Sequence, residues 1–255
     1  MLKLFFRKYG ENGFPIIILH GLFGMSDNWH NIAKRLSEQF RVYTVDLRNH
    51  GNSPHSPVMN YKVMAEDLNL LLENENIRKA YIIGHSMGGK AAMKFADIYP
   101  EKIIKMIIAD ISPRKYNASH IKYIEALKQI NFNAASRKEI EDKLAEKIID
   151  KNELLFILKN LERDENNKFK LKPNINSIEN NYEELINAID FSNKINIPVL
   201  FMKGENSDYI LSEDQKLIYS FFSNAQLKTI KNAAHWIHAE NPVDFLLETL
   251  AFFKN

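Results

Sequence analysis

The feature that most constrains this chain is a Gly-x-Ser-x-Gly motif at residues 84–88, placed between an apolar run and a helix-like segment. Residues 80–83 have strand character, and residues 90–96 have helical character. A serine raised above a sheet on such a sharp turn has a strained backbone, and side chains two residues before and after it would collide. The turn also sets Ser86 at a helix N-terminus, where free amides favour a developing negative charge. The motif therefore predicts a nucleophilic serine.

The same stretch allows two other interpretations. Residues 84–90 also read Gly-x-x-x-x-Gly-Lys, which is a phosphate-binding loop in which Ala91 replaces the hydroxyl residue that holds magnesium. The third interpretation is a glycine-rich turn that only packs a strand against a helix. The rest of the chain has to decide among the three.

Strand and helix signals alternate from residue 15 to residue 110, which predicts a mostly parallel sheet with helices on both faces. Residues 15–19 form a largely β-branched run, as expected of a strand buried on both faces. Residues 2–9 alternate loosely before a turn at residues 10–13, so we expect them to pair with the strand that follows. In such sheets the ligand lies beyond the carboxyl ends of the strands.

The pattern changes after the strand that ends near Asp110. Residues 113–190 are rich in Lys, Asn and Glu, contain no glycine and show helical stripes of Ile and Leu. We expect an all-helical lid over the site, inserted into a core made of residues 1–112 and 191–255. Strand signals resume at residues 197–204 and 225–230.

A serine needs a base within hydrogen-bond reach, and in folds of this type the order along the chain is serine, acid, histidine. His235 follows the last strand signal and is predicted to be that base, whereas His238 is expected to be structural or at the surface. A phosphate-binding protein has no use for such a histidine. The loop at residues 232–238 therefore favours the nucleophilic serine over the phosphate-binding loop.

The acid that orients the histidine has two candidates. Asp110 ends a strand that should neighbour the strand before Ser86, and we prefer it. Asp208 lies in a loop that often carries the acid in this fold type, but Ser207 occupies the usual position. A shift of one residue in an extended segment turns a side chain to the other face. Ser207 is then expected to support the acid or the base with a hydrogen bond.

The oxyanion of an acyl-transfer intermediate needs two backbone amides aimed at the site. We expect them from Met87, which follows the serine, and from Leu22, which follows an early strand. His20 and residues 46–50 are expected to brace the loops at that edge. No metal-ligand spacing occurs, so the chemistry requires neither a metal nor another cofactor.

Composition excludes several other classes of protein. With 255 residues the chain is long enough for one large domain, and a net charge of +2 is too small for a nucleic-acid footprint. No apolar run can span a bilayer, and residues 1–8 do not read as a signal peptide. The absence of cysteine fits a reducing compartment, so we expect a cytoplasmic protein. The sequence makes no prediction about oligomeric state.

The whole chain resembles the α/β-hydrolases and, within them, the YbfF-like esterases. The segments that carry the resemblance are HGLFGMSDNW (20–29), VDLRNHGNSP (45–54), GHSMGGKAAM (84–93), ADISP (109–113), GENSDY (204–209) and AAHWIHAENP (233–242). The resemblance implies that the acid is Asp110 with Ser207 nearby. It also implies esterase or thioesterase activity toward small-molecule acyl esters, including acyl-CoA.

The sequence thus predicts a serine hydrolase with the triad Ser86, His235 and Asp110. The alternatives are a nucleotide-binding protein of the phosphate-loop kind and a non-catalytic binder on the same scaffold.

Overall fold

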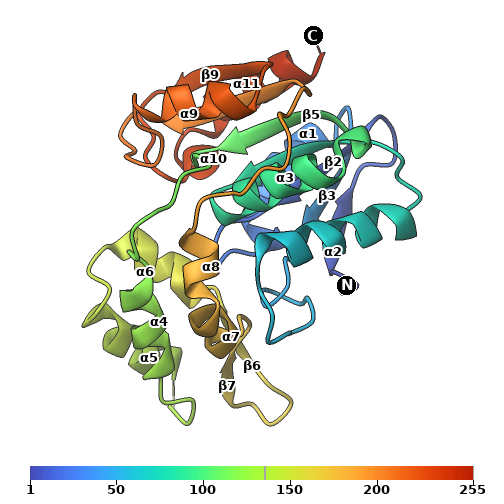
Figure 1. Ribbon diagram of the computed structural model, residues 1–255. Coiled ribbons are helices and arrows are strands. Elements are labelled where there is room, and N and C mark those ends of the chain that lie inside the picture. The colour runs from blue at the N-terminus through green and yellow to red at the C-terminus, as the bar shows by residue number, and fades with distance from the viewer. Residues whose placement is uncertain (135, 255) are drawn as a thin grey trace.

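The computed structural model describes residues 1–134 and 136–254; residues 135 and 255, which fall in the predicted lid and in the second part of the predicted core, lie outside the described residues. A seven-stranded sheet in the order β1-β3-β2-β4-β5-β8-β9 forms its centre (Figure 1). Its strands are β1 (Phe6–Tyr9), β2 (Pro15–Leu19), β3 (Arg41–Val45), β4 (Ala80–His85), β5 (Ile103–Ala109), β8 (Val199–Gly204) and β9 (Ala225–Ile230). All neighbours from β3 to β9 run parallel, so the mostly parallel sheet is confirmed.

The partner of β1 differs from the one predicted. β1 pairs antiparallel with β3, with Phe6 opposite Val45 and Tyr9 opposite Val42. It does not pair with β2, the next strand in the chain, because β2 already has β3 on one edge and β4 on the other. Gly10 and Gly13 both have positive φ and lie against the backbone of residues 37–40, so the connection leads away from a hairpin.

The two faces of the sheet are covered by different helices, because side chains alternate along each strand. In β2, Ile16 and Ile18 pack with α1 (His30–Leu36) and α11 (Pro242–Lys254). Ile17 points to the opposite face, where α2 (Tyr61–Asn74) and α3 (Met87–Ile98) lie. Helices on both faces are therefore confirmed. The short elements of this part are η1 (Ser26–Trp29), η2 (Pro100–Lys102), α9 (Asp214–Phe221) and α10 (Ile237–Glu240).

The chain leaves the sheet after β5 and returns at β8, and the elements between form a lobe at one end of the molecule (Figure 1). They are α4 (Ile121–Lys128), α5 (Arg137–Ala145), α6 (Lys151–Leu158), β6 (Leu161–Arg163), β7 (Phe169–Leu171), α7 (Ile175–Asn180) and α8 (Tyr182–Ile186). Buried side chains of this lobe, such as Ile124 and Leu127, join the core formed by α2 and α3. The boundaries 113 and 190 stay a prediction.

The sequence predicted an all-helical lobe, and this prediction is wrong because the inserted lobe contains two paired strands. β6 and β7 pair antiparallel, with Leu161 opposite Leu171. Each strand has three residues, and only Leu161 and Phe169 are buried, so neither is long enough to show a period of two. Among the described residues, no helix has the length and apolar character that crossing a membrane requires.

Candidate active site

Ser86 occupies the turn between β4 and α3 in a strained conformation. Its φ is 53° and its ψ is −119°, a region that residues with a side chain rarely adopt. A Cβ on Gly88 would come within 2.5 Å of the Leu19 carbonyl oxygen, and a Cβ on Gly84 would overlap the carbonyl of Gly88. The two glycines are therefore required by close backbone approach. The geometry is that of a nucleophile elbow.

Lys90, the lysine of the alternative phosphate-loop interpretation, does not face that turn. Its side chain is buried, and Nζ donates to the carbonyl oxygens of Arg114 at 2.9 Å, Asn187 at 2.5 Å and Ile186 at 3.4 Å. An ammonium has three donors, so none remains for a phosphate. The structure thus gives no support to a phosphate-binding loop at residues 84–90.

His235 lies against Asp110, the acid that the sequence favoured. Nδ1 of His235 is 2.8 Å from Oδ2 of Asp110, and the Asp110 carboxylate is fully buried. Ser207 donates its hydroxyl hydrogen to the same Oδ2, and the Gly204 amide donates to Oδ1 at 3.0 Å. Asp208, the alternative acid, is exposed. The structure therefore brings Asp110, Ser207 and His235 together, without Asp208.

Two rings pack against the imidazole of His235. Tyr209 stacks on it with ring centroids 3.6 Å apart and planes 17° apart, and the His85 ring lies at 4.6 Å. Nε2 of His85 also donates to the backbone carbonyl of His235 at 2.8 Å. Sequence reasoning assigned no role to His85 or Tyr209, although both lie inside the motifs at residues 84–93 and 204–209.

Burial determines the charge state of this pair. Desolvation lowers the pKa of His235 well below its ordinary value, so the imidazole is neutral at neutral pH and can accept a proton. Burial raises the pKa of Asp110, and the hydrogen bonds from Ser207 and Gly204 oppose that shift. Since Nδ1 of His235 donates to Asp110, the lone pair of the neutral ring is on Nε2.

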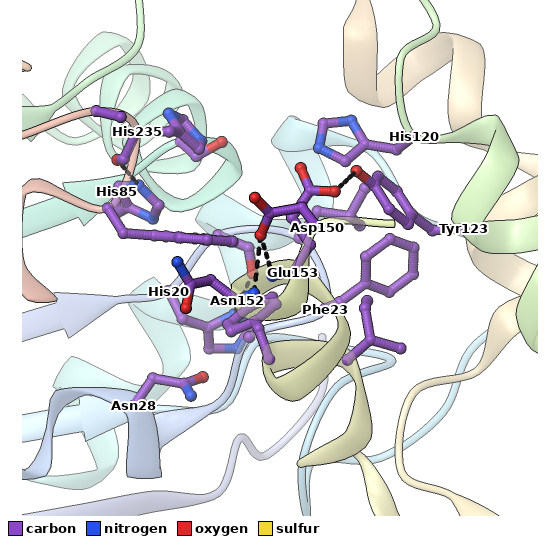
Figure 2. Close-up of a pocket in the computed structure, with 18 of the residues that line it drawn as sticks. His20, Phe23, Asn28, His85, His120, Tyr123, Asp150, Asn152, Glu153 and His235 are labelled. Carbon is purple, nitrogen blue, oxygen red and sulfur yellow. Dashed lines mark hydrogen bonds between the residues drawn. The ribbon is translucent and has the colours of Figure 1, made fainter. Parts of the chain in front are cut away.

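Two cavities meet at Ser86. The first, of about 470 Å³, is lined by Ser86 and His235 from the core and by side chains of α4 and α6 from the inserted lobe. Figure 2 shows His85 and His235 on one side of this cavity and His120 and Tyr123 of the lobe on the other. The second cavity, of about 330 Å³, is also lined by Ser86 but contains no atom of His235. Ser86 and His235 thus share one cavity, formed by both the sheet and the lobe.

The two predicted oxyanion amides flank Ser86. Met87 is the first residue of α3, and Leu22 lies in the turn after β2. Among the described residues, neither amide donates a hydrogen bond to a carbonyl of a turn or loop. Both residues line the second cavity together with Ser86. Their role as oxyanion donors stays a prediction.

Buried histidines brace the loops behind the site, as the sequence suggested. His20 donates from Nδ1 to the Gly21 carbonyl at 2.7 Å and accepts at Nε2 from the Leu47 amide at 3.0 Å. His50 accepts at Nε2 from the amide of Phe23 at 3.2 Å. Burial lowers the pKa of His20 to about 4 and that of His50 to about 3. His238 is buried too and stacks on Trp29 at 3.9 Å.

These depressed pKa values predict a loss of stability in mild acid. The unfolded chain protonates its histidines near pH 6.5 while His20 stays neutral in the fold down to about pH 4. As the pH falls through that window, each such histidine therefore lowers the free energy of unfolding by ~1.4 kcal/mol per pH unit. We expect His20→Gln to show a shallower slope in urea unfolding between pH 6.5 and 4.5, because its amide oxygen can accept from Leu47 without titrating. Above pH 7.5 the two curves should run parallel; equal slopes below pH 6.5 would contradict a neutral, buried His20.

Comparison with known proteins places this geometry in a family. Residues 15–147 match the family model described as the alpha/beta hydrolase fold. A solved structure named marine microorganism esterase is 47% identical, covers 99% of this chain and 100% of its own, and has a TM-score of 0.97. The sn-1-specific diacylglycerol lipase ABHD11 of Danio rerio is 38% identical over 249 residues, 94% of this chain and 78% of that protein. Esterase YbfF of Escherichia coli is 32% identical over 252 residues, 96% of this chain and 94% of that protein.

Proposed function

The chain belongs to the α/β-hydrolase fold family and is a carboxylic ester hydrolase, and we propose that it cleaves acyl esters or thioesters through an acyl-enzyme on Ser86. The relation to the YbfF-like esterases, which six sequence segments predicted, is confirmed. The triad, the oxyanion amides and the thioester substrates are parts of the proposal.

The observation that carries the proposal is the relation between a strained serine and a neutral imidazole. Ser86 lies at the N-terminus of α3, in the same cavity as His235. Nδ1 of His235 is hydrogen-bonded to the buried carboxylate of Asp110 at 2.8 Å, which leaves Nε2 to accept a proton. This arrangement supports general-base activation of a serine rather than simple binding of a ligand.

In the proposed mechanism, Oγ of Ser86 attacks the acyl carbon while Nε2 of His235 takes its proton. The carbonyl oxygen becomes an oxyanion between the amides of Leu22 and Met87. When the bond to the leaving oxygen or sulfur breaks, His235 transfers the proton to that atom. Water then repeats the sequence on the acyl-enzyme and releases the acid. Asp110 keeps the imidazole in the tautomer with a free Nε2.

The named relatives support the substrate class. The Danio rerio protein is named a diacylglycerol lipase and the Escherichia coli protein an esterase. These names support a small-molecule carboxylic ester as the substrate. A cytoplasmic location, suggested by a chain without cysteine, is part of the proposal.

The proposal predicts covalent labelling of one serine. A fluorophosphonate probe should add once to the protein, and peptide mass spectrometry should locate the adduct on Ser86, because only an activated serine reacts with such a probe. Turnover of p-nitrophenyl esters should stop in proportion to labelling. In parallel, acyl-CoAs with the same acyl groups test the thioester part. An unlabelled protein that still binds acyl ligands would instead support a non-catalytic binder.

A further inference from the structure

We propose that the two cavities at Ser86 divide the substrate between them, with the leaving group in the first cavity and the acyl chain in the second. This inference rests on the proposed function, because it uses the transfer of a proton from His235 to the leaving group. Each cavity would then select one part of the substrate.

Ser86 lies where the two cavities meet. The residues that line both are Leu22, Ser86, Ser119, His120 and Tyr209. A carbonyl carbon bonded to Oγ of Ser86 therefore has one opening on each side. In the tetrahedral intermediate this carbon also carries the oxyanion, the acyl chain and the leaving group. With the oxyanion held by backbone amides, we place the acyl chain in one opening and the leaving group in the other.

The proton transfer from His235 determines which cavity holds the leaving group. His235 lines the first cavity only, and its Nε2 is the ring nitrogen not bound to Asp110. The atom that receives the proton must come within hydrogen-bond reach of Nε2, and that atom belongs to the leaving group. The leaving group therefore extends into the first cavity.

The acyl chain is left with the opposite side. Met87, whose amide is proposed to hold the oxyanion, lines the second cavity and not the first. The chemistry of the second cavity suits a hydrocarbon chain, since aliphatic and aromatic side chains form most of its wall. They are Leu22, Tyr61, Met87, Ile111, Tyr116, Tyr182, Leu185, Ile186 and Tyr209.

Most N–H donors of the two cations that line the second cavity, Lys90 and Arg114, already have partners within the protein. All three donors of Lys90 go to backbone carbonyls. Arg114 binds Asp214 at 3.1 Å, donates to two carbonyls and stacks 4.0 Å from the centre of the Tyr116 ring. The wall of the second cavity is therefore mainly apolar, although the exposed side chain of Asp208 also lines it.

Lys90 also connects the wall of this cavity to both ends of the inserted lobe. Its carbonyl partners Arg114 and Asn187 lie on the two segments that connect the inserted lobe to the core. One side chain of the helix that begins beside Ser86 thus holds both connections in place.

The lining of the first cavity combines aromatic and aliphatic side chains with more polar ones than the second cavity has. Polar side chains such as Asn28, Lys122, Asp150, Asn152 and Glu153 face it, with a volume of about 470 Å³. Figure 2 shows Asn28, Asp150, Asn152 and Glu153 around this space. A leaving alcohol that carries further polar groups suits this side, because it can add hydrogen bonds to these side chains that a hydrocarbon acyl chain cannot make.

A matched pair of substitutions tests the division. Leu185 on α8 lines only the second cavity, and Ile157 on α6 lines only the first. For each variant, kcat/KM is measured on p-nitrophenyl esters from acetate to dodecanoate and on acetates of alcohols from methyl to 1-naphthyl. Leu185→Phe should lower the decanoate-to-acetate ratio at least tenfold, because each methylene without room costs about tenfold or more. Its naphthyl-to-methyl ratio should change less than twofold.

Ile157→Phe should give the reverse pattern. If either variant fails to fold, Leu185→Ala and Ile157→Ala enlarge the same walls and should move the same ratios upward. The crossed pattern, or a change of both ratios in both variants, would overturn the division of the substrate. A wild-type protein that hydrolyses none of these esters would overturn the proposed function instead, so the two failures are distinguishable.

Discussion

Ser86→Ala is expected to lower kcat for p-nitrophenyl ester hydrolysis by about 10⁶, the effect of removing the nucleophile from a serine hydrolase of unrelated fold. The loss is large because the proposed acyl-enzyme cannot form without Oγ. Binding of substrate and the two oxyanion amides remain, so a small residual rate above that of water is expected. Steady-state and single-turnover kinetics with the same ester measure both quantities.

Stability separates loss of chemistry from loss of fold. Alanine keeps the Cβ and hence the strain of a φ of 53°, so the melting temperature should stay close to that of the wild type. Ser86→Gly removes that strain, which is of order 1–3 kcal/mol, at a smaller cost in chain entropy. We expect this variant to be inactive yet more stable. Near-normal turnover in either variant would end the assignment of Ser86 as nucleophile.

The parts of the site that could be predicted from the sequence depend on short-range geometry. The Gly-x-Ser-x-Gly turn constrains its own backbone, and the glycines lie against Leu19 and Gly88 as steric reasoning requires. The alternation of strands and helices from residue 15 to residue 110 limits the fold to a few topologies. These features determine the sheet and the place of Ser86 at its carboxyl edge.

Other features of the structure depend on long-range packing, which no local sequence pattern specifies. The stacking of Tyr209 on His235 joins two loops 26 positions apart in the sequence, and no local pattern specifies it. The partner of β1 depends on which strand still has a free edge. The hairpin β6–β7 has too few residues to show a period. Cavity walls contributed by α4, α6 and α8 belong to the same class, since a helical stripe does not say where its helix docks.

The acid had remained ambiguous in the sequence because chain order admits both Asp110 and Asp208. The structure separates the two by burial and by hydrogen bonds. The Asp110 carboxylate is fully buried between the Gly204 amide, the Ser207 hydroxyl and His235, while Asp208 is exposed. The contacts that favour Asp110 come from three segments distant in sequence, so spacing alone does not reveal them.

Asp110→Asn is expected to lower kcat by about 10⁴, as the same change does in a serine protease of unrelated fold. The Gly204 amide donates to Oδ1 at 3.0 Å, so the oxygen of the new amide must stay at that position. Its NH₂ group then takes the place of Oδ2 and donates to Nδ1 of His235. The imidazole is forced into the tautomer with hydrogen on Nε2 and has no lone pair to accept the proton of Ser86.

Asp208→Asn is the matched control, because it makes the same chemical change on an exposed side chain. Its kcat should stay within about twofold of the wild type, since an exposed carboxylate contributes little to a buried pair. Ser207→Ala should fall between the two, because it removes one hydrogen bond to Oδ2 and keeps the carboxylate. If Asp208→Asn instead loses activity and Asp110→Asn keeps it, the acid of the triad has been assigned to the wrong loop. Equal and small losses in both variants would mean that His235 needs no carboxylate to act as the base.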